Sequence, residues 1–304
     1  MTSTRRLITT ALLLSVLVSG GAAHAQRIFA TMWAVGEGTS GAIVEIRENE
    51  GPVSIWDIPH APYILPEDEF LLSGGLAYDG NLVYHGFTVD SIVGPPESYI
   101  VALDPDGDNS GAVPDGDDGL GPILGMAALG GLIYINHGNV GSQLISAYDP
   151  VSGDIVRSMD VLDEFPVPVL VTGLGGERYM GVDILAGIVY NAASGDAGIA
   201  AFDPNTGDLI VGVPVDSTDT VFLGLGMFRD GMAVAGLELA LPPLGVLTML
   251  AGDGTPIIQQ NTGSLIVTDL AGDGEMFAPS VAVPEPASLA LLGLGALALR
   301  RRRK

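Results

Sequence analysis

The stretch "GIAAFDPNTGD", residues 198–208, carries the pattern that decides the fold. An alternating apolar run leads into Asp-Pro-x-x-Gly, and the same phrase occurs as "LISAYDPVSGD" (144–154) and "YIVALDPDGD" (99–108), with a decayed copy at 245–255. The Asp accepts backbone N–H bonds at the first turn position, the Pro presets φ, and the Gly supplies a positive φ before the next strand. Each copy therefore predicts a β-hairpin.

A second element precedes each hairpin, and it consists of a Gly-rich apolar strand, a tight turn and another apolar strand. It occupies residues 74–87, 124–138, 172–191 and 223–236. The two elements together give about four strands per repeat, which is typical of one blade of a β-propeller. The phrases "GLAYDG" and "DPNTG" are similar to those of extracellular propellers of the YVTN and quinoprotein-like type, and this resemblance implies an all-β propeller fold.

The two ends of the repeat region predict how the ring closes. Residues 27–58 offer three strands, and residues 263–272 offer one spare strand after the last hairpin. A propeller must pair its terminal strands, because open sheet edges invite aggregation. We expect 263–272 to complete the first blade beside 27–35, which gives five blades; six remain open if 59–73 or 215–222 holds further strands. The residues expected to be buried between blades are Leu76, Tyr84, Ile100, Leu103, Ile133, Tyr148, Ile199 and Phe202.

The first 25 residues resemble a secretory signal peptide. Two arginines, an apolar run from Leu7 to Val18 and small residues precede Ala25. This predicts cleavage between Ala25 and Gln26, with a retained membrane anchor as the alternative. The chain contains no Cys, so no disulfide stabilises the exported protein.

The last residues, "VPEPASLALLGLGALALRRRRK" (283–304), form a second distinct segment. As a helix the apolar run would reach about 20 Å, against roughly 30 Å of bilayer hydrocarbon, and the basic end should stay in the cytoplasm. The segment resembles the PEP-CTERM sorting signal of Gram-negative bacteria that make extracellular polysaccharide. This resemblance implies that Pro284, Glu285 and Pro286 are recognised by an exosortase-type membrane enzyme, after transient anchoring in the inner membrane.

These segments divide the chain into four parts. They are a signal peptide at 1–25, a propeller at 26–272, a linker at 273–283 and the sorting signal at 284–304. The formal net charge is −24, and loss of both ends would leave about −30. Such a body repels nucleic acid and anionic lipid, and it favours counter-cations or simply solubility.

An acidic segment, "DPDGDNSGAVPDGDDG" (104–119), is the candidate cation site. Asp104, Asp106 and Asp108 have the alternate spacing of calcium loops, and Asp115 stands at the twelfth position. Asn109 occupies the usual Gly position, and Asp104 is also the hairpin Asp of the other repeats. Both a Ca²⁺ site and a solvated acidic loop therefore remain open.

Catalytic signals are weak in this sequence. His85 and His137 follow similar strands, so they could approach one another in a propeller channel or be strand-end residues on loops. There is no Cys nucleophile, no Gly-x-Ser-x-Gly elbow and no phosphate loop. We expect a non-catalytic surface or extracellular-matrix protein whose propeller is a binding or scaffold module, and extracellular polysaccharide is its candidate partner. The alternative is a secreted propeller hydrolase or lyase acting on polysaccharide or lactone.

Overall fold

The computed structural model describes residues 27–34, 41–47, 51–58, 69–91, 95–106, 120–139, 142–179, 182–215, 217, 219–228, 231–239, 244–250, 256–263 and 265–272. Several predictions concern residues outside these ranges. They are the signal peptide with Ala25 and Gln26, the linker, the sorting signal with Pro284, Glu285 and Pro286, and the acidic residues Asp108 and Asp115.

The described chain is almost entirely β-strand, with one short 3-10 helix, η1 (Leu162–Glu164). The strands are β1 (Ile28–Ala34), β2 (Gly41–Arg47), β3 (Gly51–Ile58), β4 (Glu69–Tyr78), β5 (Val83–Ser91), β6 (Glu97–Leu103), β7 (Ile123–Leu129), β8 (Leu132–Asn139), β9 (Ser142–Asp149), β10 (Asp154–Asp160), β11 (Val169–Tyr179), β12 (Val182–Asn191), β13 (Ala197–Phe202), β14 (Leu209–Val215), β15 (Thr220–Phe228), β16 (Gly231–Glu238), β17 (Leu244–Leu250), β18 (Pro256–Gly263) and β19 (Leu265–Gly272).

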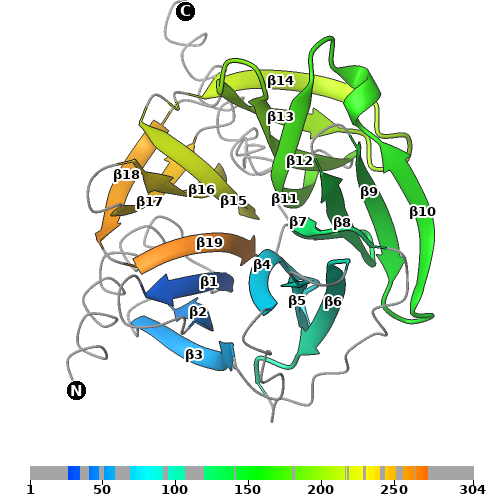
Figure 1. The fold of residues 1–304 in the computed structure, drawn as a ribbon. Helices are drawn as coiled ribbons and strands as arrows, with labels where there is room; N and C mark the ends of the chain where they lie inside the picture. The colour runs from blue at the N-terminus through cyan, green and yellow to red at the C-terminus, as the bar shows by residue number, and fades with distance from the viewer. Residues whose placement is uncertain are drawn as a thin grey trace, which may run out of the picture.

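These strands form five antiparallel sheets in the described part of the chain. We name them blade 1 (β19-β1-β2-β3), blade 2 (β4-β5-β6), blade 3 (β7-β8-β9-β10), blade 4 (β11-β12-β13-β14) and blade 5 (β15-β16-β17-β18). The inner strands β4, β7, β11, β15 and β19 surround the centre, and β3, β6, β10, β14 and β18 lie at the periphery (Figure 1). The all-β propeller prediction is confirmed.

The closure of the ring follows the prediction from the chain ends. β19 pairs antiparallel with β1, from Ile28 opposite Gly272 to Ala34 opposite Leu265. The last described strand thus becomes the inner strand of the blade that begins the chain (Figure 1). This pairing places the two ends of the propeller region in one sheet, so neither leaves an unpaired inner edge.

The Asp-Pro turns have the predicted geometry. The Asp104, Asp149 and Asp203 carboxylates each accept a hydrogen bond from the backbone N–H two residues later, at 2.7–2.9 Å. Gly153 and Gly207 have φ of +80° and +84°, and their N–H groups close the turns. We call the face that carries these turns the lower face and the face where the inner strands begin the upper face.

The apolar core is divided among the blade interfaces. Buried apolar residues form five clusters, and each cluster joins two neighbouring blades: 1 with 2, 2 with 3, 3 with 4, 4 with 5, and 5 with 1. All eight residues predicted to be buried have relative exposures of 6% or less. Burial of apolar surface between blades, at about 25 cal/mol per Å², is therefore what holds the ring together.

Glycine lets the inner strands approach one another closely. A Cβ atom on Gly125 of β7 would lie 2.6 Å from the Gly173 carbonyl carbon of β11, and one on Gly224 of β15 would lie 2.4 Å from the Thr268 carbonyl oxygen of β19. Backbone therefore packs on backbone at these positions. The Gly-rich segments of the sequence therefore include the positions where the backbones of neighbouring inner strands contact one another.

Candidate functional site

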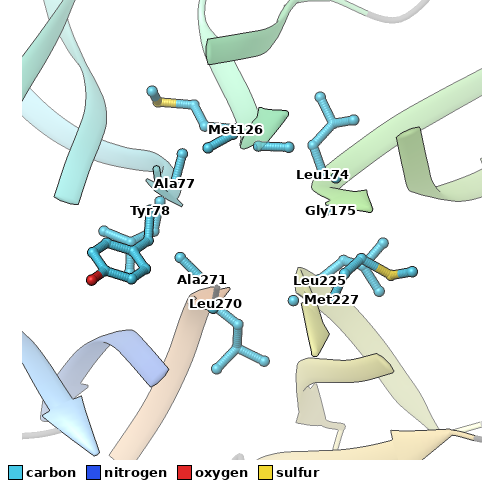
Figure 2. Close-up of a pocket in the computed structure, with 15 residues that line it drawn as sticks. Ala77, Tyr78, Met126, Leu174, Gly175, Leu225, Met227, Leu270 and Ala271 are labelled. Carbon is cyan, nitrogen blue, oxygen red and sulfur yellow. The ribbon is translucent and has the colours of Figure 1, made fainter. Parts of the chain in front are cut away.

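The axis of the ring is narrow. Three consecutive residues from each inner strand line it, from Leu76–Tyr78 of β4 round to Leu270–Gly272 of β19 (Figure 2). The cavity has a volume of about 10 Å³, which is room for about one water molecule. The described part of the axis therefore has no space for a substrate-sized ligand.

A larger cleft lies off the axis, between blades 4 and 5 on the upper face, and its volume is about 830 Å³. Its walls come from β11, β12, the loop after β12, the end of β14 and the start of β15. The lining residues are Leu170, Thr172, Tyr190, Ser194, Gly195, Asp196, Val215, Ser217, Thr220, Val221, Phe222, Leu223 and Leu239. We call this space the upper cleft.

Tyr190 of β12 joins the two walls of the upper cleft. Its hydroxyl donates to the Phe222 carbonyl oxygen at 2.9 Å and accepts a short hydrogen bond from the Phe222 N–H. Burial raises the pKa of the phenol to about 12, so it stays protonated at neutral pH. The side chain thus satisfies both backbone groups of a residue on the next blade.

The other polar groups of the upper cleft are partly committed to the fold. The Ser194 hydroxyl donates to the Asp196 carboxylate at 2.7 Å, and the Ser217 hydroxyl accepts from the Ala197 N–H at 3.1 Å. By contrast, the Thr172 hydroxyl oxygen is buried and has no hydrogen-bond partner. A buried polar atom without a partner costs about 1–3 kcal/mol, and because this oxygen is closed off from solvent, a ligand in the upper cleft does not reach it in this conformation.

Similar polar contacts connect other blades. The Thr88 hydroxyl accepts from the Ile123 N–H at 3.0 Å, and the Gln143 amide accepts from the Val171 N–H and donates to the Val171 carbonyl, both at 2.8 Å. Ile123 comes just before the irregularity in its inner strand, as Phe222 does in β15. Sequence reasoning missed these contacts, because each joins residues about 30 positions apart with no shared motif.

The two candidate histidines are structural in the described geometry. His85 lies in β5 and His137 in β8, and their relative exposures are 0% and 7%, so the interpretation as loop residues is wrong. Desolvation lowers the pKa of His85 to about 4 and also lowers that of His137. Both imidazoles are therefore neutral at pH 7.

His137 forms a hydrogen bond with a serine, but its tautomer does not suit a general base. The Gly121 N–H donates to His137 Nδ1 at 3.1 Å, which assigns the proton of the neutral ring to Nε2. His137 Nε2 then donates to the Ser146 hydroxyl at 2.8 Å, and Ser146 contacts Ser158 at 2.8 Å. A general base needs the opposite tautomer, so this buried chain connects strands.

The acidic loop is described only in part. Asp106 contacts Arg27 through both carboxylate oxygens, at 2.7 and 3.1 Å, and the same guanidinium contacts Glu45 at 2.6 Å. Arg27 therefore links blade 1 to the turn that follows β6 of blade 2. No group of three His, Asp or Glu residues suited to a metal ion occurs among the described residues, and Asp108 and Asp115 lie outside them. The Ca²⁺ hypothesis stays a prediction, and any such ion would compete with Arg27 for Asp106.

Glu177 of β11 is a buried carboxyl group that the sequence did not single out. Its relative exposure is 1%, and Oε1 has no hydrogen-bond partner. It lies opposite Ile184, two positions from the pair of Gly175 with Ala186, and so on the face that packs against blade 5. Desolvation raises the pKa of Glu177 to about 7. The alternation of apolar and Gly residues around it gave no sign of this burial.

Comparison with protein families matches residues 282–304 to the PEP-CTERM protein-sorting motif. The chain carries a PEP-CTERM sorting signal. This motif implies an exported protein of the cell envelope that is processed by an exosortase, a membrane enzyme. A search of curated proteins finds no match to this chain.

Two examples from the solved structures that match this chain share the propeller fold. The GH43_1 enzyme from Xanthomonas citri in complex with xylose is 12% identical, with a TM-score of 0.53 over 88% of this chain and 98% of that one. The same enzyme in complex with xylotriose is 11% identical, with a TM-score of 0.51 over 88% and 99%. At this level of identity the similarity shows the fold alone.

A search of the described residues for membrane-crossing helices finds none with enough length and apolar character. The predicted signal helix and the apolar run at 287–299 lie outside the residues searched.

Proposed function

We propose that this protein is a non-catalytic component of the cell surface or extracellular matrix, and that its propeller is a binding or scaffold module associated with extracellular polysaccharide. The observation that carries the proposal is the sorting motif at residues 282–304, which gives an exported, envelope-associated destination. In this proposal the tail is a sorting signal. It holds the chain in the inner membrane until it is processed there, and the acidic propeller is then released outward.

The geometry of the propeller supports a binding role over catalysis at the axis. The axial cavity of about 10 Å³ excludes a sugar, whereas the upper cleft of about 830 Å³ has the volume of a small-molecule site. The upper cleft contains hydroxyl groups and one carboxylate among the described lining residues. Glycoside hydrolysis ordinarily requires two carboxyl groups about 5–9.5 Å apart on either side of the scissile bond.

A secreted polysaccharide-degrading enzyme is the second candidate, and Glu177 is the observation that favours it. A carboxyl group with a pKa of about 7 has the proton affinity of a general acid. It lies toward the lower face, however, whereas the upper cleft is at the other end of β11. Release of reducing sugar from a polysaccharide by the purified protein, and its loss in Glu177→Gln, would establish the enzyme instead.

Replacing Glu285 tests the proposed sorting step. Glu285 is the only charged residue between Glu275 and Arg300, and charge-assisted recognition of a carboxylate is comparatively strong. We expect Glu285→Ala to retain full-length protein in the membrane fraction and Ser288→Ala to behave as the unmodified chain does. Equal release of the two variants from the membrane would contradict recognition through Glu285.

A further inference from the structure

We infer that the upper cleft binds an uncharged, hydroxyl-rich ligand, a neutral oligosaccharide, and that it rejects anionic glycans. This inference rests on the proposed function and makes it more specific, since it assigns both the site and the chemical class of the ligand. The site lies between blades 4 and 5, which are neighbours in the ring (Figure 1), and none of its lining residues lines the axial cavity.

The charge of the surrounding chain excludes an anionic ligand. No Lys, Arg or His occurs between Arg178 and Arg229, the stretch that supplies most of the cleft wall. The same stretch contains Asp196 in the lining and the exposed Asp219, which directly precedes the lining residue Thr220. An anion entering the upper cleft would meet carboxylates without a compensating cation, so uronic acids and phosphorylated glycans are disfavoured.

The hydrogen-bonding groups of the cleft suit hydroxyls. The exposed Asp196 carboxylate can accept hydrogen bonds in addition to the one from Ser194, and the Ser217 hydroxyl, which accepts from the Ala197 N–H, can still donate. A sugar hydroxyl is both donor and acceptor, so it can complement each of these groups.

The apolar part of the lining suits the C–H faces of sugar rings. Leu170, Val215, Val221 and Leu239 accompany the polar groups around the cleft, and Leu239 is 64% exposed at its rim. Ligand sites are predominantly apolar with a few placed polar groups, and their volumes are about 300–1,000 Å³. A bare metal ion does not fit this lining, because it needs several charged or carbonyl oxygens in contact with it.

Binding can be measured with the full chain, purified in detergent, on two series of immobilised oligosaccharides of equal length. One series is neutral, with cello-, xylo-, arabino- and mannohexaose, and the other is acidic, with oligogalacturonate and oligoalginate. We expect at least one neutral hexaose to bind and the acidic series to bind at least tenfold more weakly at 150 mM salt.

Two variants locate the site. Leu239→Asp adds a charge to the rim at an exposed position, and we expect it to weaken binding about tenfold or more. The matched control is Val182→Asp, which makes the same kind of change at a 60% exposed position on the lower face of blade 4. Asp196→Ala removes the carboxylate that accepts from the ligand hydroxyls, and we expect it to weaken binding about five- to tenfold.

The outcomes separate this inference from the proposed function. The cleft assignment is overturned if no neutral hexaose binds, if the acidic series binds better, or if Leu239→Asp and Val182→Asp bind alike. Recovery of the bound hexaose in cleaved form would overturn the non-catalytic function and leave the cleft assignment in place. Recovery of the intact hexaose supports both.

Discussion

The axial cavity and the upper cleft are bordered by the same inner strands, β11 and β15, yet their volumes are about 10 and 830 Å³. Next to the axial lining, glycines allow the backbones of neighbouring inner strands to touch, as at Gly125 against Gly173, which directly precede the lining residues Met126 and Leu174. Between blades 4 and 5, a phenol bridges the gap to Phe222. The comparison teaches that side-chain size at a few positions sets the space between inner strands. Glycines bring the strands together beside the axis, whereas a tyrosine spans the wider space between blades 4 and 5.

The largest expected effect comes from disturbing the closed region. Gly125→Ala places a Cβ atom 2.6 Å from the Gly173 carbonyl carbon, and backbone on both sides prevents easy relaxation. We expect a loss of about 3 kcal/mol in the free energy of unfolding, measured by denaturant titration. Gly212→Ala is the control, because its Cβ would meet only the Ile199 carbonyl oxygen at 4.0 Å; a similar loss in both variants would contradict the account of the axis.

A buried charge between blades 4 and 5 should make the free energy of unfolding depend on pH, by up to about 3 kcal/mol. The pKa of Glu177 is about 7 in the folded protein, above its ordinary value of 4.5. Below pH 4.5 the Glu177 carboxyl is neutral in both the folded and the unfolded protein, so its burial carries no ionisation cost. As pH rises from 4.5 to 7, only the unfolded state ionises readily, and stability is lost at 1.36 kcal/mol per unit of pKa difference.

The measurement compares thermal unfolding at pH 5 and pH 8 in the unmodified protein and in Glu177→Gln. The variant should be the less pH-dependent of the two, since it cannot ionise. Glu97→Gln at an exposed position controls for the general repulsion of an acidic protein. If Glu177→Gln and Glu97→Gln change the pH dependence equally, Glu177 does not have the assigned role.

Removing the Tyr190 hydroxyl from the wall of the upper cleft should lower the free energy of unfolding by about 1–3 kcal/mol. Tyr190→Phe leaves the Phe222 N–H and carbonyl without their side-chain partner while keeping the ring. Unfolding by denaturant provides the measurement. Tyr99→Phe is the control, since its hydroxyl contacts the exposed Glu97 and should change stability by about 0.5 kcal/mol or less; equal effects would mean that the Tyr190 contact does not hold the wall.

The smallest expected effect concerns the acidic loop of blade 2. If Asp104, Asp106, Asp108 and Asp115 bind Ca²⁺, a concentration ten times Kd stabilises the folded protein by about 1.4 kcal/mol. Millimolar Ca²⁺ should then raise Tm, and Asp106→Ala should abolish the rise. Arg27→Gln frees Asp106 from its ion pair and should enlarge the rise. An unchanged Tm in the unmodified protein would contradict the Ca²⁺ site and favour a solvated acidic loop.

Local patterns made the fold predictable from sequence. The Asp-Pro turns are determined within about five residues, as the Asp203 carboxylate and Gly207 show. The count of strands at the two ends predicted the pairing of β19 with β1, because a ring leaves few alternatives for a spare strand. Periodicity within each strand identified the eight core residues.

The candidate site was not predictable in this way, since it depends on contacts between blades. Tyr190 and Phe222 lie on different sheets, and nothing in either strand indicates the other. The burial of Glu177 and of His85 likewise depends on which neighbouring blade covers them. Sequence patterns give the faces of a strand, whereas the packing of one blade on the next sets the chemistry between them.

Mass spectrometry of the protein recovered from the cell surface tests the central claim most directly, which is that this chain is exported and sorted through its tail. We predict a mature protein that begins at Gln26 and whose C-terminal peptide lacks Ala287 to Lys304. A surface protein whose C-terminal peptide still includes Ala287 to Lys304 would show a permanent anchor and contradict this account.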